Sequence, residues 1–293
     1  MNHVEKKLKK IDKAIINYQN NIDNLICPVC QSSLTLIDKA LQCSNKHTFN
    51  FNKKGYVNFI NYSNDTIYDE KLFEARANVL HAGLYDHIID KLIDIIIENF
   101  AHFERIHLLD AGCGEGYYLN KIHEKLNDTN TFLGVDLSSH AISKATNYNQ
   151  DTLLMVANLA NLPIANEKID IILNILSPVN YEQFVRVLNK RGLIVKVIPN
   201  ANYLKEIRHK LTTKDFDNHM VINLFKAKVD DYQEYNLSQT FDINTRLYES
   251  IIEMSPLTSD LSDKKKEALK EFPSDTITID MKILVGKKRD SDD

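Results

Sequence analysis

The sequence predicts an α/β fold, with a doubly wound parallel sheet behind a small metal-binding module. From about Tyr85 onward, apolar strand-like runs alternate with helix-like segments, which is typical of a parallel sheet covered by helices. The run LLDAGCGEG (108–116) ends a strand-like stretch in an acid and then places three glycines within five residues. Ahead of it, three cysteines and a histidine fall between positions 27 and 47. These observations indicate a ligand-binding sheet and a module held together by a metal.

Length and composition bound the possibilities. With 293 residues and 43% hydrophobic side chains, the chain can form one full-sized domain and a smaller one. It contains no run of eighteen apolar residues, and its charged start, residues 1–13, lacks the apolar region of a secretory signal. We therefore expect no membrane span and a cytoplasmic location.

Charge is unevenly distributed along the chain. Residues 1–62 hold nine lysines and four acidic residues, whereas the remainder holds 27 basic and 36 acidic residues. A basic N-terminal stretch ahead of an acidic remainder is compatible with charged residues that are simply solvated and, equally, with contact to an anionic polymer.

Four segments follow from these patterns: an N-terminal helix (1–24), a small zinc-binding module (25–62), a helical connector (63–84) and a large domain (85–293). In the first segment, apolar residues spaced by three and four from Val4 to Leu25 predict a helix. This helix is expected to brace the large domain or to form a dimer contact, and the sequence leaves both open.

Within the large domain, strands are expected at 105–110, 131–136, 152–157, 169–174 and 192–198, and helices at 115–126, 138–147, 181–188 and 201–211. The last part differs, with strand-like stretches at 233–243 and 275–286 around a helix at 245–254. The sheet is therefore expected to close with an antiparallel pair.

The cysteines and the histidine have the spacing of a structural zinc site. Cys27 and Cys30 form C-x2-C, and Cys43 and His47 form C-x3-H after an interval of twelve residues. Two turns with two ligands each can supply the four corners of a tetrahedron, which leaves no open position for a catalytic water. Four cysteines in all, one of them in the glycine run, do not suggest a disulfide framework. The expectation is one structural Zn²⁺.

The glycine run predicts a cofactor loop. Strand, acid, G-x-G-x-G and helix is an arrangement that brings backbone close to a ligand at the carboxyl edge of a parallel sheet. No Gly-Lys-Ser/Thr follows, and Gly116 comes one residue too early for a dinucleotide fingerprint. Asp136, at the end of the next expected strand, can accept hydrogen bonds from both hydroxyls of a ribose. A nucleoside-bearing cofactor fits this combination best.

On these residues the chain resembles the class I S-adenosylmethionine-dependent methyltransferases, whose sheet is Rossmann-like. LLDAGCGEG is similar to their first motif, GVDLS (134–138) to their second, and ANLANLPI (157–164) to the segment after the third strand. The resemblance implies that S-adenosyl-L-methionine is the cofactor and that Asp136 holds its ribose. The other implied contacts are the methionine-end residues Asp110, Gly112, Gly114 and Glu115, their neighbour Gly116, and the adenine contact Asn158.

Both halves together resemble the 23S rRNA (guanine-N1)-methyltransferases, from the zinc module through EARANVLHAGLYDHI (74–88) to about residue 210. NILSPVNYEQFVRVL (174–188) is most similar to the tylosin-resistance branch. The resemblance implies that the module recognises 23S rRNA, that Tyr85 contacts the cofactor and that the protein is a homodimer. The chain departs from the family pattern at three places. A usual histidine cofactor contact is Tyr203 here, the usual Pro-Gly-Gly before the fifth strand keeps only Gly192, and Asn50 stands where the pattern tends to aspartate.

The acceptor site is predicted less directly. Asn174, Ser177 and Pro178, at the end of the fourth expected strand, are candidates for the pocket of the acceptor base, and a turn proline is the competing interpretation. No general base stands out among the histidines.

RNA phosphates are expected to meet lysines of the module. The module's aromatic residues (Phe49, Phe51, Tyr56 and Phe59) could stack on bases, although a role as its small core is favoured for the first three. The lysines are Lys39, Lys46, Lys53 and Lys54.

Two other functions remain open from the sequence. A small-molecule methyltransferase would use the same cofactor domain, but the zinc module argues against it. A zinc-dependent RNA-binding protein with a silent methyltransferase domain is the second, and the intact cofactor residues argue against that.

Overall fold

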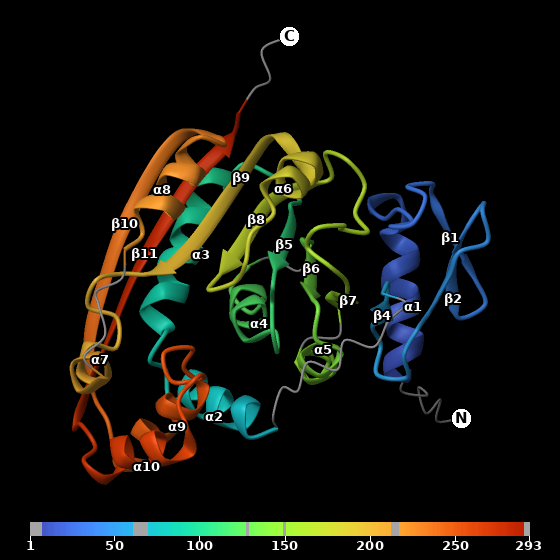
Figure 1. Cartoon of the computed structure of the whole chain (residues 1–293). Helices are drawn as coiled ribbons and strands as arrows, with labels where there is room; N and C mark the ends of the chain where they lie inside the picture. The colour runs from blue at the N-terminus through green and yellow to red at the C-terminus, as the bar shows by residue number, and fades with distance from the viewer. Residues whose placement is uncertain (1–7, 61–69, 127–128, 149–150, 212–216, 290–293) are drawn as a thin grey trace, which may run out of the picture. The chain divides into compact units, whose positions relative to one another are not determined.

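The computed structural model describes residues 8–60, 70–126, 129–148, 151–211 and 217–289. They form two compact units, which are coloured along the chain in Figure 1. The first contains the described residues up to Ile60 and Phe100–Ile194, and the second contains Glu70–Asn99 and Val195–Arg289. Parts of the expected N-terminal helix (4–7) and connector (63–69) lie outside the described residues.

The first unit is built on a parallel sheet with the strand order β8 (Ile169–Ile175), β5 (His107–Ala111), β6 (Thr131–Asp136), β7 (Leu153–Val156) and β4 (Val57–Asn58). The middle strands are almost wholly buried, as expected when both faces of a parallel sheet are covered. Asp110 pairs with Gly134, and Asp136 pairs with Val156. The carboxyl ends of three neighbouring strands therefore lie along one edge.

Helices begin directly after this edge: α4 (Tyr117–His123), α5 (Ser139–Ala145) and α6 (Tyr181–Val187). The Ser138 hydroxyl caps α5 by accepting a hydrogen bond from the Ala141 amide (3.2 Å), and Asn180 caps α6 in the same way. Gly116, with φ +79°, starts α4, and a Cβ there would lie only 3.0 Å from the Cβ of Ala145. The third glycine of the loop thus lets the start of α4 approach α5.

The zinc module carries a three-stranded antiparallel sheet of β1 (Leu34–Ile37), β2 (Ala40–Cys43) and β3 (Thr48–Asn50). Its four aromatic residues are at most 8% exposed, which confirms that they serve as core. That core is partly shared, because Tyr56 packs in one cluster with Cys113 of the glycine loop and Ile142 of α5. The short strand β4, just after the module's last turn, pairs with β7 of the large sheet. The module is therefore joined by packing and by backbone hydrogen bonds to the edge of the sheet where the carboxyl ends of β5, β6 and β7 lie. We call this edge the cofactor edge, after the cofactor loop predicted there.

The N-terminal helix α1 (Lys10–Asn20) braces the same sheet (Figure 1). Tyr18 is fully buried and donates a 2.6 Å hydrogen bond to the carbonyl of Leu154 in β7. Lys10 donates to the carbonyl of Thr146 at the end of α5 (2.8 Å). Of the two roles left open by the sequence, these contacts support the brace.

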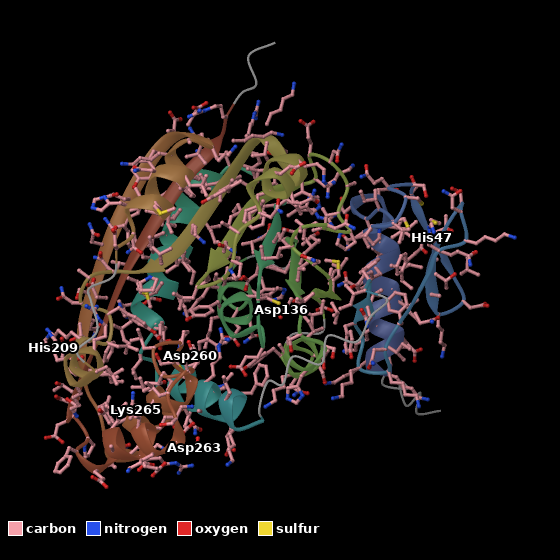
Figure 2. All side chains as sticks on the ribbon, in the orientation of Figure 1. His47, Asp136, His209, Asp260, Asp263 and Lys265 are labelled. Carbon is pink, nitrogen blue, oxygen red and sulfur yellow. The ribbon has the colours of Figure 1, made fainter. Side chains whose placement is uncertain are left out.

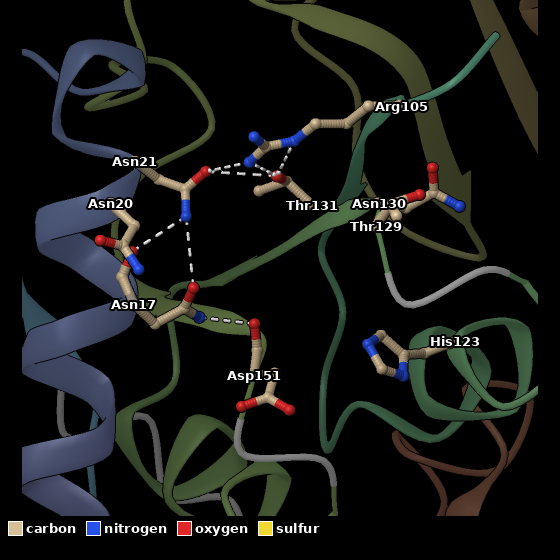
Figure 3. Close-up of a pocket in the computed structure, with 9 residues that line it drawn as sticks. All are labelled: Asn17, Asn20, Asn21, Arg105, His123, Thr129, Asn130, Thr131 and Asp151. Carbon is tan, nitrogen blue, oxygen red and sulfur yellow. Dashed lines mark hydrogen bonds between the residues drawn. The ribbon is translucent and has the colours of Figure 1, made fainter.

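A polar pocket of about 550 Å³ lies where α1 meets the amino edge of the sheet, on the side of the strands away from the glycine loop (Figure 3). Arg105 donates to the side chains of Asn21 (2.8 Å) and Thr131 (2.6 Å), so its guanidinium ties the helix to the start of β6. Asn17 donates to the backbone carbonyl of Asp151. The contacts in this pocket reinforce the brace.

The second unit combines helices with a long antiparallel strand pair. Strand β10 (Val229–Asp242) pairs with β11 (Thr276–Lys288), and two helices separate them in the chain. The chain enters this unit along β9 (Leu188–Pro199). The helices are α2 (Glu70–His81), α3 (Asp86–Phe100), α7 (Lys205–Leu211), α8 (His219–Lys226), α9 (Thr245–Met254) and α10 (Asp263–Glu271). The side-chain amide of Asn78 in α2 donates a hydrogen bond to the hydroxyl of Ser250 in α9 (3.4 Å).

Most expected elements are present, with shifted ends. The structure confirms the antiparallel closing pair and the helix at 245–254. Three helices were not expected: α3, α8 and α10. The expected helix at 181–188 ends at Val187, and β9 begins at Leu188 rather than at Gly192. A Cβ at Gly192 would lie 2.3 Å from Leu188 Cγ, so this glycine makes room for a side chain of its own strand.

Among the described residues, no helix combines the length and apolar character needed to cross a membrane.

Candidate active site and metal centre

The predicted zinc ligands converge in the first unit. The donor atoms of Cys27, Cys30, Cys43 and His47 all lie within 4.8 Å of one another. The Sγ atoms of Cys30 and Cys43 are 3.6 Å apart, and His47 Nδ1 lies 3.4 Å from Cys43 Sγ. A tetrahedron with Zn–S bonds of about 2.3 Å has edges of roughly 3.8 Å, so the cluster has the size that zinc requires. His47 is labelled in Figure 2.

The protonation chemistry of the cluster also suits a cation. The hydrogen bond between Ser32 Oγ and Cys30 Sγ (3.1 Å) lowers the pKa of the Cys30 thiol, whereas burial raises the pKa of Cys27. A bound divalent cation removes the proton from a coordinating thiol. With four protein ligands, the ion stabilises the module and leaves no coordination position for catalysis.

The glycine loop follows the carboxyl end of β5, and its three glycines have left-handed backbone conformations. Gly112, Gly114 and Gly116 have φ values of +89°, +55° and +79°. Such angles disfavour residues with a Cβ, so the three glycines are required by the path of the loop itself. Asp110 and Glu115 are 1% and 4% exposed and flank the loop. Two buried carboxylates at a loop of bare glycines fit a ligand that carries an ammonium group, as the methionine end of the cofactor does.

Asp136, which Figure 2 labels, ends β6 and ties this strand to the glycine loop. One carboxylate oxygen accepts a hydrogen bond from the Gly114 amide (2.9 Å), and the other accepts one from the Ser138 amide (2.8 Å). A carboxylate offers about four acceptor positions. The two backbone bonds therefore orient the group while leaving acceptor capacity for ribose hydroxyls.

The segment after β7 is held in place by an arginine. Arg186 of α6 donates to the carbonyls of Ile164 (2.7 Å) and Leu162 (2.9 Å). Asn158, the predicted adenine contact, accepts a hydrogen bond from the Ala160 amide (2.9 Å) and thereby forms a tight turn at the same edge. Sequence reasoning missed Arg186, whose role depends on tertiary contacts.

The turn after β8 lies directly against the glycine loop. A Cβ at Gly112 would be 1.8 Å from Ser177 Oγ and 4.0 Å from Leu159 Cδ1. Gly112 is therefore bare partly because Ser177 packs against it, a reason that differs from the ligand approach expected from the sequence. Asn174 is fully buried, and its amide donates to the carbonyls of Ala111 (2.8 Å) and Pro178 (2.9 Å). The turn that carries the three candidate acceptor residues thus packs directly on the cofactor loop, and the hydrogen bonds of Asn174 fix the conformation of this turn.

Two predicted cofactor residues belong to the second unit. The hydroxyls of Tyr85 and Tyr203 are 2.8 Å apart, and both side chains are buried. Burial raises the pKa of Tyr203, so its phenol remains neutral at physiological pH. Each tyrosine fixes the other by this hydrogen bond.

The four lysines singled out in the module are exposed. Lys54 reaches across to Ser143 of α5, where its ammonium donates a hydrogen bond to the hydroxyl. Because α5 begins just after Asp136, this contact brings the module's basic turn close to the helix that follows the cofactor edge. Lys53 lies in the same turn.

Comparison with protein families gives two matches. Residues 102–272 match a methyltransferase domain family, and residues 25–61 match the RlmA N-terminal zinc ribbon. The first match covers more than half of the chain. The second covers all four candidate zinc ligands.

Curated relatives extend over most of the chain. A putative 23S rRNA (guanine-N1)-methyltransferase, YxjB from Bacillus subtilis, is 32% identical over 271 residues, which cover 89% of this chain and 96% of the relative. The 23S rRNA (guanine(748)-N1)-methyltransferase of Streptomyces fradiae is 27% identical over 64% of this chain and 68% of that protein.

The cofactor and metal follow from these findings together with the geometry. The methyltransferase domain uses S-adenosylmethionine, and the Cys3His cluster is a structural zinc site. With its ribbon joined to a class I methyltransferase sheet, the chain belongs to the family of 23S rRNA (guanine-N1)-methyltransferases.

Proposed function

We propose that this protein transfers a methyl group from S-adenosylmethionine to N1 of a guanine in a hairpin loop of 23S rRNA. The observation that carries the proposal is the physical union of the zinc ribbon with the cofactor edge, through β4 and the shared cluster around Tyr56. Relatives named for this activity align with the ribbon and the methyltransferase domain together. A small-molecule enzyme would have no evident use for such a module.

The chemistry places modest demands on the protein. The sulfonium of the cofactor supplies an electrophilic methyl group, so the chain has to align donor and acceptor. Guanine N1 carries a proton and lies on the Watson–Crick edge, so the base must be unpaired or extruded before it reacts. In this proposal Asp136 orients the ribose, and Asn174, Ser177 and Pro178 shape the place where the base enters. The N1 proton leaves to solvent or to a group of the complex.

The remaining cofactor contacts follow the family pattern. Asp110, Glu115 and the close backbone of the glycine loop hold the methionine end, and Asn158 contacts adenine. The family pattern also implies cofactor contacts for Tyr85 and for Tyr203, which stands at the position of the usual histidine.

The module supplies RNA contacts through lysines at positions 39, 46, 53 and 54. All four are exposed at the surface, where phosphates can reach them, while the neighbouring aromatic rings are buried and are unsuited to stacking on bases. In this division of roles the module provides affinity for RNA, and the residues at the sheet edge carry out methyl transfer.

The wider organisation belongs to the same proposal. Residues 25–62 act as the RNA-recognition module and residues 85–293 as the methyltransferase domain, with 1–24 and 63–84 as the helix and connector. We further propose a homodimer that works in the cytoplasm on 23S rRNA.

The test is methyl transfer from labelled S-adenosylmethionine to 23S rRNA that lacks the modification, with the position mapped by primer-extension stops. We expect a stop at an unpaired guanine. Asp110→Ala should abolish label through loss of cofactor binding, and Lys53→Ala with Lys54→Ala should weaken RNA binding and lower its salt dependence by about two phosphate contacts. Lys228→Ala, an exposed lysine of the second unit, is the matched control.

The rival functions give different results. Cofactor binding without label in RNA, and with label in a small molecule, would point to a small-molecule enzyme. RNA binding with no methyl transfer to any acceptor would point to a binding protein with a silent domain.

A further inference from the structure

The turn after β8 contains a residue in an unfavourable conformation. Leu176 has φ +50°, in the left-handed region that residues with a Cβ rarely adopt. Seven described non-glycine residues have positive φ, and five of them are polar. The other leucine, Leu204, is fully buried, so packing accounts for its conformation. Leu176 is 38% exposed and gains much less from burial.

Neighbouring contacts enforce this conformation. The Asn174 amide closes the turn by donating to the carbonyls of Ala111 and Pro178. Pro178 restricts Ser177 before it to extended backbone. A buried side chain and a proline thus hold the turn from both sides, and glycine or asparagine at position 176 would adopt the same path with less strain.

The position of the turn points to a use for the exposed side chain. Ser177, the next residue, packs against Gly112 of the cofactor loop, and Leu159 lies at the same glycine. Leu176 therefore lies at the carboxyl edge of the sheet, beside the loop that holds the methyl donor. Retained strain at such a place is typical of a functional residue.

We propose that Leu176 is the apolar surface against which the acceptor guanine is held during methyl transfer. The inference rests on the proposed function and adds a residue that determines the position of the base. The flat face of a guanine is apolar enough to pack on a leucine side chain, whereas its edges need polar partners. Asn174 acts through the turn and is a positioning residue.

The experiment separates strain from contact with three variants. Leu176→Gly and Leu176→Asn fit the left-handed backbone but remove the apolar surface, and Leu176→Met keeps it. We expect kcat/KM for 23S rRNA to fall about fivefold in the glycine and asparagine variants, since covering the exposed 38% of Leu176 contributes ~1 kcal/mol. Their Kd for S-adenosylmethionine should change by less than about twofold and their Tm should not fall. The methionine variant should stay within about twofold of the wild type.

Glu167→Gly is the matched control. Glu167 has φ +56° and lies just before β8, at the other end of the same strand. This variant should relieve comparable strain and leave methyl transfer unchanged. Wild-type kcat/KM in Leu176→Gly and Leu176→Asn would overturn this inference and leave the proposed function standing. A wild-type protein that methylates no RNA would overturn the proposed function, and this inference with it.

Discussion

Gly112→Ala tests the contact between the cofactor loop and the turn after β8. An alanine at φ +89° is strained by about 1–2 kcal/mol. Its Cβ would also lie 1.8 Å from Ser177 Oγ and 2.6 Å from Ser177 Cβ, so the turn must move, at a further cost of about 1–3 kcal/mol. We therefore expect a loss of roughly 2–5 kcal/mol in the free energy of unfolding, together with weaker cofactor binding.

Two further variants isolate the contact. Gly83→Ala has a similar φ of +79°, but its Cβ would meet only the flexible Asp86 carboxylate at 3.0 Å, so about 1–2 kcal/mol is expected. Adding Ser177→Gly to Gly112→Ala removes the obstructing atoms and should recover at least about 1 kcal/mol in a double-mutant cycle. Denaturant unfolding is measured for the wild type, for the single variants Gly112→Ala, Ser177→Gly and Gly83→Ala, and for the double variant. No coupling between positions 112 and 177, or equal losses for the two alanine variants, would refute the reasoning.

Three other changes test the metal, the brace and the ribose site. Cys43→Ser should abolish stoichiometric zinc and RNA binding while the Kd for S-adenosylmethionine is kept, and full zinc content in this variant would count against the cluster. Tyr18→Phe should lower the free energy of unfolding by about 1–2 kcal/mol, because the buried carbonyl of Leu154 loses its 2.6 Å bond; an unchanged denaturation midpoint would exclude the brace. Asp136→Ala should weaken S-adenosylmethionine binding by about 10–100-fold in calorimetry, as expected for lost charge-assisted hydrogen bonds, and wild-type affinity would remove it from the site.

Local patterns were sufficient to predict the metal cluster and the cofactor loop. The four zinc ligands occupy two tight turns, so their spacing in sequence carries most of the geometry. The glycine run is equally local, because its left-handed residues must be glycines wherever the loop lies. Strands with buried runs, such as β6, were placed with correct ends.

Features that depend on tertiary contacts were not predictable. The pairing of β4 with β7 joins only two residues to a strand that is distant in the sequence, and so short a strand shows no periodicity. Ser177 packs on Gly112 because two strand ends meet in space. Helix α10 has the sequence DKKKEALKE, with one buried residue, Leu269, so its apolar pattern is too weak to stand out. Leu176 carries no sequence signal for its left-handed backbone.

The central claim concerns the atom that receives the methyl group. The most direct measurement is nucleoside mass spectrometry of unmodified 23S rRNA after incubation with the protein and S-adenosylmethionine, with Asp110→Ala as the blank. The account predicts one new 1-methylguanosine, located in a hairpin loop. A methyl group on another nucleoside or another guanine atom, or none above the blank, would contradict it.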